Sequence, residues 1–165
     1  MNRITEREDR AARDAAAESA GARILRMTPD GKTGTSMEVV LRNRIDALAQ
    51  AIRDRNVDHL MTFYARDVEV FDVRPPLDVH GSDAYRQNFE RFFGMFQGSL
   101  NFELNNLRVV PGEPAAFCHY LGLVSGTRPN GHQTSGYWVR GTTCFERRDG
   151  EWIVTHEHIS MPVTI

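Results

Sequence analysis

The residue whose type and surroundings are best suited to chemistry is Asp72. It is an acid between the apolar residues Phe71 and Val73, at the end of the segment Val68–Val73, which has the β-branched composition of a strand. Burial disfavours the charged carboxylate and raises its pKa, so a buried Asp72 would be a usable general base near neutral pH. The structural alternative is a strand-end aspartate that caps the loop containing Pro75 and Pro76. Both interpretations remain open from the residues alone.

A second group of reactive side chains is the triplet His156-Glu157-His158. The two histidines have the i, i+2 spacing of a metal pair on one face of a strand, but no third ligand follows at a diagnostic spacing. We therefore expect no metal. No Gly-x-Gly-x-x-Gly follows a strand and no Walker loop is present, so we expect no nucleotide or other cofactor.

Three helices are predicted to position these groups. Apolar residues recur at helical spacing from Val39 to Ile52, with Ser36 in the N-cap position. A shorter amphipathic helix is expected from Val57 to near Asp67. A third follows Ser82 and stops around residues 94–98. Its four phenylalanines are more typical of a core than of a ligand box, with a cavity floor formed by their inner edge as the alternative. They are Phe89, Phe92, Phe93 and Phe96.

The second half of the chain reads as four long strands joined by turns that contain glycine or proline. Three hairpins in series make an antiparallel meander. Helices followed by such a meander indicate an α+β fold, in which a curved sheet and the helices enclose a pocket for a small molecule. The predicted strands are Leu100–Val110, Ala115–Ser125, Gly136–Arg147 and Glu151–Val163.

Composition excludes several classes of protein. The 165 residues, 41% of them hydrophobic and 25% charged, have the size and balance of one globular domain. A net charge of -2 supplies no basic field for phosphates, so we expect no nucleic-acid partner. No stretch approaches the roughly 18 apolar residues of a membrane span, so we expect no membrane association.

The N-terminal part and the cysteines suggest a cytoplasmic protein with a loose extension. Residues 1–36 are rich in Ala, Arg, Glu and turn formers, which predicts a frayed helix and a linker ahead of a domain at 37–165. Met1–Asp14 is charged, with no apolar segment after it. Cys118 and Cys144 lie in apolar runs, which is typical of free thiols in a reducing compartment.

Two segments carry a family resemblance. Phe63–Asp72, FYARDVEVFD, followed by a proline loop and Gly81, resembles the ketosteroid-isomerase and SnoaL-like members of the nuclear-transport-factor-2-like superfamily. Thr143–Ser160, TCFERRDGEWIVTHEHIS, is similar to the SnoaL-like 3 and DUF4440 branch and to the association domain of calcium/calmodulin-dependent kinase II. The likeness covers about residues 37–163 and implies a cone-shaped α+β fold that hosts isomerases, dehydratases, epoxide hydrolases and non-catalytic hubs.

The resemblance also implies roles for single residues. Asp72 falls where ketosteroid isomerases keep their proton-shuttling carboxylate. Their oxyanion donors, a tyrosine and a protonated aspartate, would fall near Leu48 and Gly141, and neither residue can donate such a hydrogen bond. Loss of one oxyanion donor typically costs about 10²–10³ in rate, so steroid isomerisation itself is disfavoured.

Strand alternation, set by the resemblance, assigns side chains to the concave wall. One strand is expected to place His119, Leu121 and Leu123 there, the next Gly141, Thr143 and Phe145, and the last Thr155, Glu157 and Ile159. His119 would then pair with Asp72 or Glu157 as acid and base, with a buried structural histidine as the alternative. Tyr64 and Asn88, from the second and third helices, are further pocket candidates.

The same alternation assigns a polar cluster to the convex face, where proteins of this fold usually dimerise. Its members are Arg140, Trp152, His156 and His158. A bulge that shifted the alternation by one residue would turn this cluster into the pocket and remove Glu157 from it, and an anionic ligand would then be expected.

Two classes of function are compatible with these features. One is a cofactor-independent enzyme, an isomerase or lyase that acts by acid–base chemistry on a small, partly apolar carbonyl or hydroxyl compound, with Asp72 as base. The other is a non-catalytic ligand-binding or hub-like oligomerisation domain. A homodimer is expected in either case.

Overall fold

The computed structural model describes residues 26–27, 33–34 and 36–163. Contacts divide the chain into two units, Met1–Val39 and Val40–Ile165. In the first unit, strands β1 (Arg26–Met27) and β2 (Thr33–Gly34) pair antiparallel. The predicted frayed helix before Arg26 lies outside the described residues, and the predicted linker is described only at its end, where it forms β2. The domain boundary at residue 36 stays a prediction.

Three helices occur among the described residues, as expected, but only two of them are long. They are α2 (Ser36–Arg53), α3 (Val57–Met61) and α4 (Ser82–Phe93). Asn56 begins α3, because its side-chain oxygen accepts a hydrogen bond from the backbone N–H of His59 at 3.0 Å. The prediction that this helix continues to near Asp67 is wrong: the chain is already extended from Tyr64.

The helix α2 is amphipathic. Its buried residues recur at intervals of three and four, and a glutamate in the first turn and an arginine in the last turn match the helix dipole. The apolar residues on this stripe are Leu41, Ile45, Leu48, Ala49 and Ile52. Arg53, at the C-terminal end of α2, donates to the carbonyl of Phe102 at 2.8 Å and so ties the helix to the sheet.

Six strands form one mixed sheet in the order β4-β3-β8-β7-β6-β5. The four long C-terminal strands make the predicted antiparallel meander, and β3 joins β8 in parallel. The bounds are β3 (Tyr64–Phe71), β4 (Val79–His80), β5 (Leu100–Val110), β6 (Ala115–Gly126), β7 (Tyr137–Arg148) and β8 (Glu151–Ser160).

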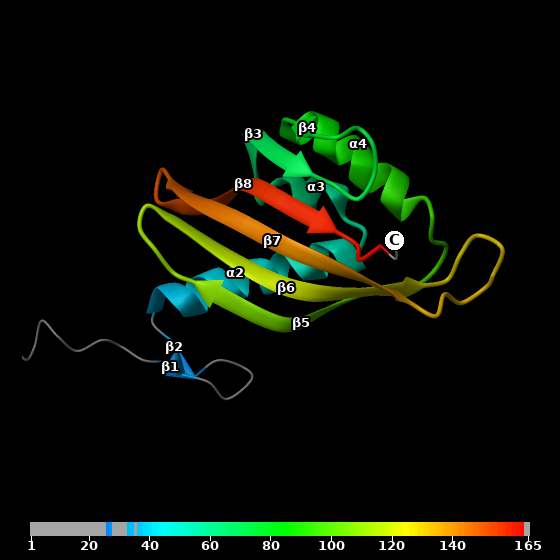
Figure 1. Cartoon of the computed structure of the whole chain (residues 1–165), viewed down its shortest axis with the longest axis horizontal. Helices are drawn as coiled ribbons and strands as arrows, with labels where there is room; N and C mark the ends of the chain where they lie inside the picture. The colour runs from blue at the N-terminus through cyan, green and yellow to red at the C-terminus, as the bar shows by residue number, and fades with distance from the viewer. Residues whose placement is uncertain (1–25, 28–32, 35, 164–165) are drawn as a thin grey trace, which may run out of the picture. The chain divides into compact units, whose positions relative to one another are not determined.

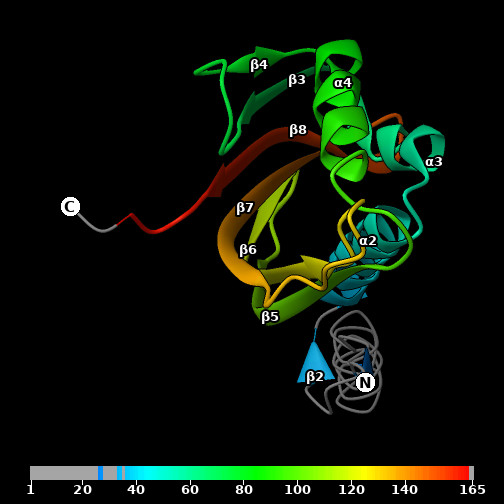
Figure 2. The ribbon, with the colours of Figure 1, turned by 90° about the vertical axis from the view of Figure 1, so that its right-hand side faces the viewer.

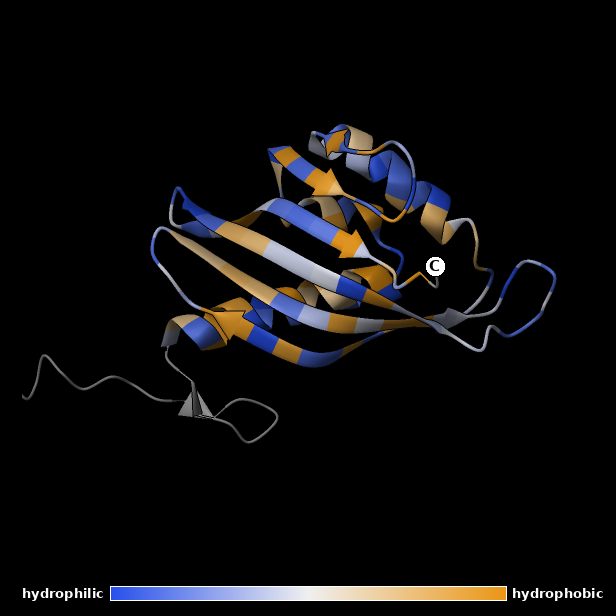
Figure 3. Ribbon diagram, in the orientation of Figure 1, coloured by the Kyte–Doolittle hydropathy of each residue, from blue (hydrophilic) through white to orange (hydrophobic). Residues whose placement is uncertain are grey.

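The sheet curls strongly across the meander, and the helices lie on its concave side (Figures 1 and 2). Apolar and polar residues alternate along the long strands (Figure 3), so one face of each strand packs inward. In β6, buried residues alternate with more exposed ones over the whole strand. The predicted α+β architecture, a curved sheet covered by helices, is confirmed.

Gly81 connects β4 to α4 in a backbone conformation that favours glycine. Its φ of 86° lies in the left-handed region, and its N–H donates to the carbonyl of Val68 at 2.8 Å. This turn sends α4 back across β3 and directs Tyr85 and Asn88 toward the interior, where both are buried.

The two cysteines are unpaired: Cys118 is buried and Cys144 is half-buried. The prediction of free thiols is confirmed. Burial raises the pKa of the Cys118 thiol to about 12, so this group behaves as a small apolar side chain. Among residues 26–27, 33–34 and 36–163, no helix has the length and apolar character to cross a membrane.

Candidate functional site

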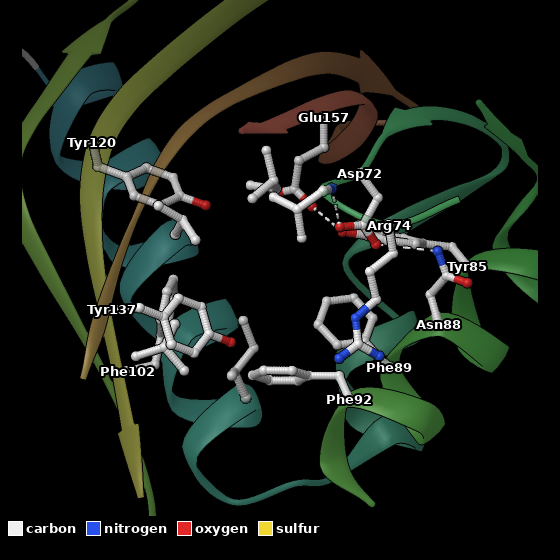
Figure 4. Close-up of a pocket in the computed structure, with 15 residues that line it drawn as sticks. Asp72, Arg74, Tyr85, Asn88, Phe89, Phe92, Phe102, Tyr120, Tyr137 and Glu157 are labelled. Atoms are coloured by element: carbon white, nitrogen blue, oxygen red, sulfur yellow. Dashed lines mark hydrogen bonds between the residues drawn. The ribbon is translucent and has the colours of Figure 1, made fainter. Parts of the chain in front are cut away.

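A cavity of about 100 Å³ lies between the concave face of the sheet and the helices (Figure 4). It is smaller than the roughly 300 Å³ typical of ligand pockets. Its walls come from α2, α4, the loop after β3 and the four meander strands. The lining residues are Ile52, Asp72, Val73, Arg74, Tyr85, Asn88, Phe89, Phe92, Phe102, Tyr120, Val124, Tyr137, Val139, Glu157 and Ile159.

Glu157 lies at the buried end of this cavity and is only 2% exposed. Its Oε2 accepts hydrogen bonds from the hydroxyls of Tyr64 at 2.9 Å and Tyr85 at 2.7 Å. Its Oε1 accepts from the hydroxyl of Thr143 at 3.0 Å. Three hydroxyl groups from three elements thus hold the carboxyl group in one orientation.

Burial is the largest influence on the pKa of Glu157 and raises it. The hydrogen bonds from Tyr85, Tyr64 and Thr143 act in the opposite direction, and the charge of Asp72 raises the pKa further. The pKa values of Tyr64 and Tyr85 lie well above the usual tyrosine value, because both hydroxyls are buried beside Glu157. Both tyrosines therefore stay neutral and serve as hydrogen-bond donors.

Asp72 follows the last residue of β3 and is half-buried at the cavity wall. Its Oδ1 accepts from the backbone N–H of Val73 at 2.6 Å, and its Oδ2 accepts from the side-chain amide of Asn88 at 3.1 Å. The amide oxygen of Asn88 accepts in turn from Arg91. Asn88 thus fixes the orientation of the Asp72 carboxylate, and two carboxyl groups share one cavity.

Tyr120 and Tyr137 direct their hydroxyls into the cavity from the sheet, across from Asp72, Arg74 and Asn88 (Figure 4). Burial, followed by the nearby Glu157, raises the pKa of Tyr120 well above its usual value. Tyr120 reaches this position because its cross-strand neighbour is Gly141: a Cβ there would overlap the Tyr120 ring. The hydroxyl of Tyr120 is thus a neutral hydrogen-bond donor inside the site.

This arrangement changes the expectation about oxyanion donors. Leu48 is a buried apolar residue and position 141 carries no side chain, so neither supplies a donor, as predicted. Tyr120 nevertheless brings a hydroxyl into the cavity over Gly141. The family resemblance implies donors only at positions 48 and 141, so this hydroxyl is not expected from it.

The prediction that His119, Leu121 and Leu123 face the concave wall is wrong. In β6 the buried residues are Ala116, Cys118, Tyr120, Gly122, Val124 and Gly126, so the odd-numbered side chains face outward. His119 is exposed and does not line the cavity, and it therefore cannot pair with Asp72 or Glu157 there. Both faces of β6 carry apolar residues, so hydropathy alone did not decide the direction.

Several of the residues predicted on β7 and β8 do face inward. Thr143, Phe145 and Glu157 are buried on the inner side, and Glu157 lines the cavity. Thr143 acts through its hydrogen bond to Glu157, and Phe145 belongs to the core without reaching the cavity wall. Asn88 lines the cavity as predicted. Tyr64 is buried beside it, but at the start of β3 rather than on a helix.

Three members of the predicted convex cluster lie on the outer face: Arg140 and His158 are exposed and His156 is half-buried. The rings of His156 and His158 contact Phe71 of the neighbouring strand at centroid distances of 5.0 and 5.9 Å. Trp152 is the exception, because it is 6% exposed and packs inward.

A β-bulge explains the exception. Val154 and His156 pair with the consecutive residues Phe145 and Cys144, so Thr155 is an extra residue in β8. Before the bulge, Trp152 and Val154 face inward; after it, Glu157 and Ile159 do. The bulge therefore exists, but Glu157 keeps its place in the cavity.

Four polar or charged residues of the cavity wall were not predicted as site residues: Arg74, Tyr85, Tyr120 and Tyr137. Tyr85 lies in the helix α4, and its i, i+4 spacing with Phe89 places both side chains on one face. Within the described ranges, no group of three or more His, Cys, Asp or Glu side chains is placed to hold a metal ion.

The fold and the enclosed cavity define the class of protein, an α+β protein of the nuclear-transport-factor-2-like type. Residues 41–164 match the SnoaL-like domain, and the chain belongs to this family. No curated protein matches the sequence.

Several solved structures are similar. An NTF2-like protein of unknown function from Pseudomonas putida KT2440 has 31% sequence identity and a TM-score of 0.71, over 78% of this chain and 88% of that chain. A ketosteroid isomerase-like protein from Erwinia carotovora atroseptica has 15% identity and a TM-score of 0.67, over 78% and 98%. The association domain of C. elegans CaMKII has 19% identity and a TM-score of 0.58, over 75% and 98%.

Proposed function

We propose that this protein is a cofactor-independent acid–base enzyme of the isomerase or lyase type. Its substrate would be a small, partly apolar compound with a carbonyl or hydroxyl group. One observation supports this most strongly: two carboxyl groups, Asp72 and Glu157, line one largely apolar cavity together with the neutral hydroxyl of Tyr120.

Asp72 is the proposed general base. It accepts a proton from the carbon next to the substrate carbonyl, and the electron pair of that C–H bond moves into an enolate whose oxygen accepts a hydrogen bond from Tyr120. The carboxyl of Glu157, whose pKa is raised by burial, is the proposed second proton-transfer group. Return of the proton to another carbon gives isomerisation, whereas loss of a hydroxyl group, protonated as it leaves, gives elimination of water.

Proton exchange tests this proposal without knowledge of the product. A panel of small ketones and hydroxyketones is incubated with the protein in D₂O, and deuterium uptake at the carbon beside the carbonyl is followed by NMR. We expect catalysed exchange with the native chain and a loss of about 10²–10⁴ in rate with Asp72→Asn, the usual contribution of a general base. The exposed Asp78, which pairs with His80, provides the control variant Asp78→Asn.

Exchange at the uncatalysed rate with every compound, or equal rates for the native chain and Asp72→Asn, would refute the enzyme proposal. If the same compounds still raised the melting temperature, the non-catalytic ligand-binding domain would be the better description.

We also propose that the chain forms a homodimer through the outer face of the sheet. Large apolar side chains lie exposed on this face, Phe71 at 44%, Phe117 at 40% and Trp138 at 46%, next to Arg140 and the two histidines. An apolar area of this kind on a curved sheet is typical of a protein–protein interface. The similarity to an association domain supports the same proposal.

A further inference from the structure

Arg74 brings a positive charge into the cavity that the acid–base proposal does not use. It lies in the loop between β3 and β4, two residues after Asp72, and is half-buried. Figure 4 shows its guanidinium group projecting into the cavity beside Phe92. A guanidinium is always charged and offers five N–H donors in a planar fork.

The hydrogen-bonding capacity of Arg74 is almost unused. Its one hydrogen-bond contact in the described part of the chain is to the sulfur of Met95, and a thioether is a weak acceptor. By contrast, the arginines at positions 86, 147 and 148 each pair with a carboxylate. A half-buried guanidinium without an anionic partner is unfavourable unless a ligand or water supplies acceptors.

Arg74 is not the partner of Asp72. The two oxygens of Asp72 accept from Val73 and Asn88, and no ion pair joins Arg74 to Asp72 among the described residues. The charge of Arg74 acts instead on Tyr137: burial raises the pKa of this tyrosine, and Arg74 is the largest influence that lowers it. Figure 4 shows the guanidinium and the Tyr137 hydroxyl projecting into the same cavity from facing walls.

The rest of the cavity wall is suited to a ligand with an apolar body. Phe89, Phe92 and Phe102 contribute aromatic rings, and Ile52 and Val139 contribute aliphatic side chains. A ligand that matches this cavity is small, has an apolar ring or chain, and carries one anionic group at the Arg74 end.

We propose that Arg74 is the binding residue for a carboxylate on the substrate, and that the substrate class is therefore small apolar carboxylic acids, as their anions. The guanidinium would donate two parallel hydrogen bonds to the carboxylate, and the Tyr137 hydroxyl a third. Binding at this end would direct the remainder of the molecule toward Asp72. This last step rests on the acid–base proposal, whereas the carboxylate site does not.

Matched acid and amide probes test the site. Isothermal titration with benzoate and benzamide, and with phenylacetate and phenylacetamide, compares molecules of nearly the same shape that differ in charge. We expect the native chain to bind each carboxylate at least about tenfold more tightly than its amide, the factor expected for a charge-assisted pair. In Arg74→Gln this preference should fall to about one.

Two further variants test whether the preference for carboxylates depends on Arg74 itself rather than on another charged residue. Arg86→Gln removes a charge from α4 that pairs with Asp58 outside the cavity, so it should retain the preference for carboxylates. Asp72→Asn should also retain it, even if all proton exchange is lost. Circular dichroism melts of each variant check that the fold is intact.

Equal affinity for acid and amide in the native chain, an unchanged preference in Arg74→Gln, or no binding of either acid at millimolar concentration would overturn the proposal. Failure of the acid–base proposal gives a different result: the carboxylate preference depends on Arg74, but no ketone or hydroxyketone of the exchange panel takes up deuterium.

Discussion

The hydrogen-bonded Glu157 leads to a quantitative prediction for Tyr85→Phe. This change removes one hydroxyl donor from a buried carboxyl group and keeps the ring, which packs against Tyr64 and Phe89. A hydrogen bond to a charged group contributes about 1.5–3 kcal/mol to stability. For a domain of this size each kcal/mol corresponds to about 3–5 °C, so the melting temperature should fall by about 5–15 °C at a pH where Glu157 is ionised.

The loss should depend on pH. The folded-state pKa of Glu157 is raised by burial, so the folded chain binds this proton more tightly than the unfolded chain. The stability contribution of this group is therefore complete below the unfolded value of about 4.3 and decreases as pH rises through the folded pKa. Removal of a donor raises that pKa further. The variant should therefore lose more stability above the folded-state pKa than at pH 4, where Glu157 is largely neutral and a neutral hydrogen bond of about 0.5–1.5 kcal/mol is at stake.

Urea denaturation at a series of pH values from 4 to 9 measures the free energy of unfolding that Tyr85→Phe loses and the dependence of this loss on pH. Tyr137→Phe is the matched control: its hydroxyl lines the same cavity, and no hydrogen bond from it to a described residue is present. We expect this variant to change stability by less than about 0.5 kcal/mol. A Tyr85→Phe loss as small as the control's, or one that is equal at every pH from 4 to 9, would show that the carboxyl group does not depend on this donor.

Two further predictions concern the sheet. Gly141→Ala should destabilise the domain by about 1–3 kcal/mol, because the new Cβ overlaps the Tyr120 ring, and it should slow proton exchange by displacing the Tyr120 hydroxyl. Urea denaturation and NMR exchange measure the two effects, and a variant as stable as the native chain would contradict the prediction. Phe117→Glu should convert the expected dimer to a monomer, as measured by sedimentation at micromolar concentration. Leu77→Glu, on the exposed loop after β3, should leave the dimer intact. A native chain that is already monomeric would refute the dimer.

Much of the fold could be predicted from the sequence because its signals are local. The helical spacing of apolar residues in α2 and α4 and the turns of the meander each fall within short windows. The start of β3 was harder to predict, since Phe63 and Tyr64 continue the helical spacing of α3, and only pairing with β8 makes Tyr64 extended.

The site was predictable only in part, because it depends on which face each strand turns inward. The family resemblance favours Asp72 as a site residue, and its half-buried side chain lines the cavity. Tyr120 was missed because β6 is apolar on both sides, so a one-residue error in alternation replaced Tyr120 by His119. Arg74 lies in a loop, where no periodicity indicates the direction of a side chain.

The bulge at Thr155 decides the chemistry of the cavity. Trp152 and Val154 face inward before it, so a regular strand would continue with His156 and His158 on the inner face and turn Glu157 outward. The cavity would then hold two imidazoles beside Asp72. The extra residue instead places Glu157 under the hydroxyls of Tyr64, Tyr85 and Thr143 and leaves the histidines on the outer face beside Phe71. One inserted residue thus gives this cavity a second carboxyl group and the proposed interface its imidazoles.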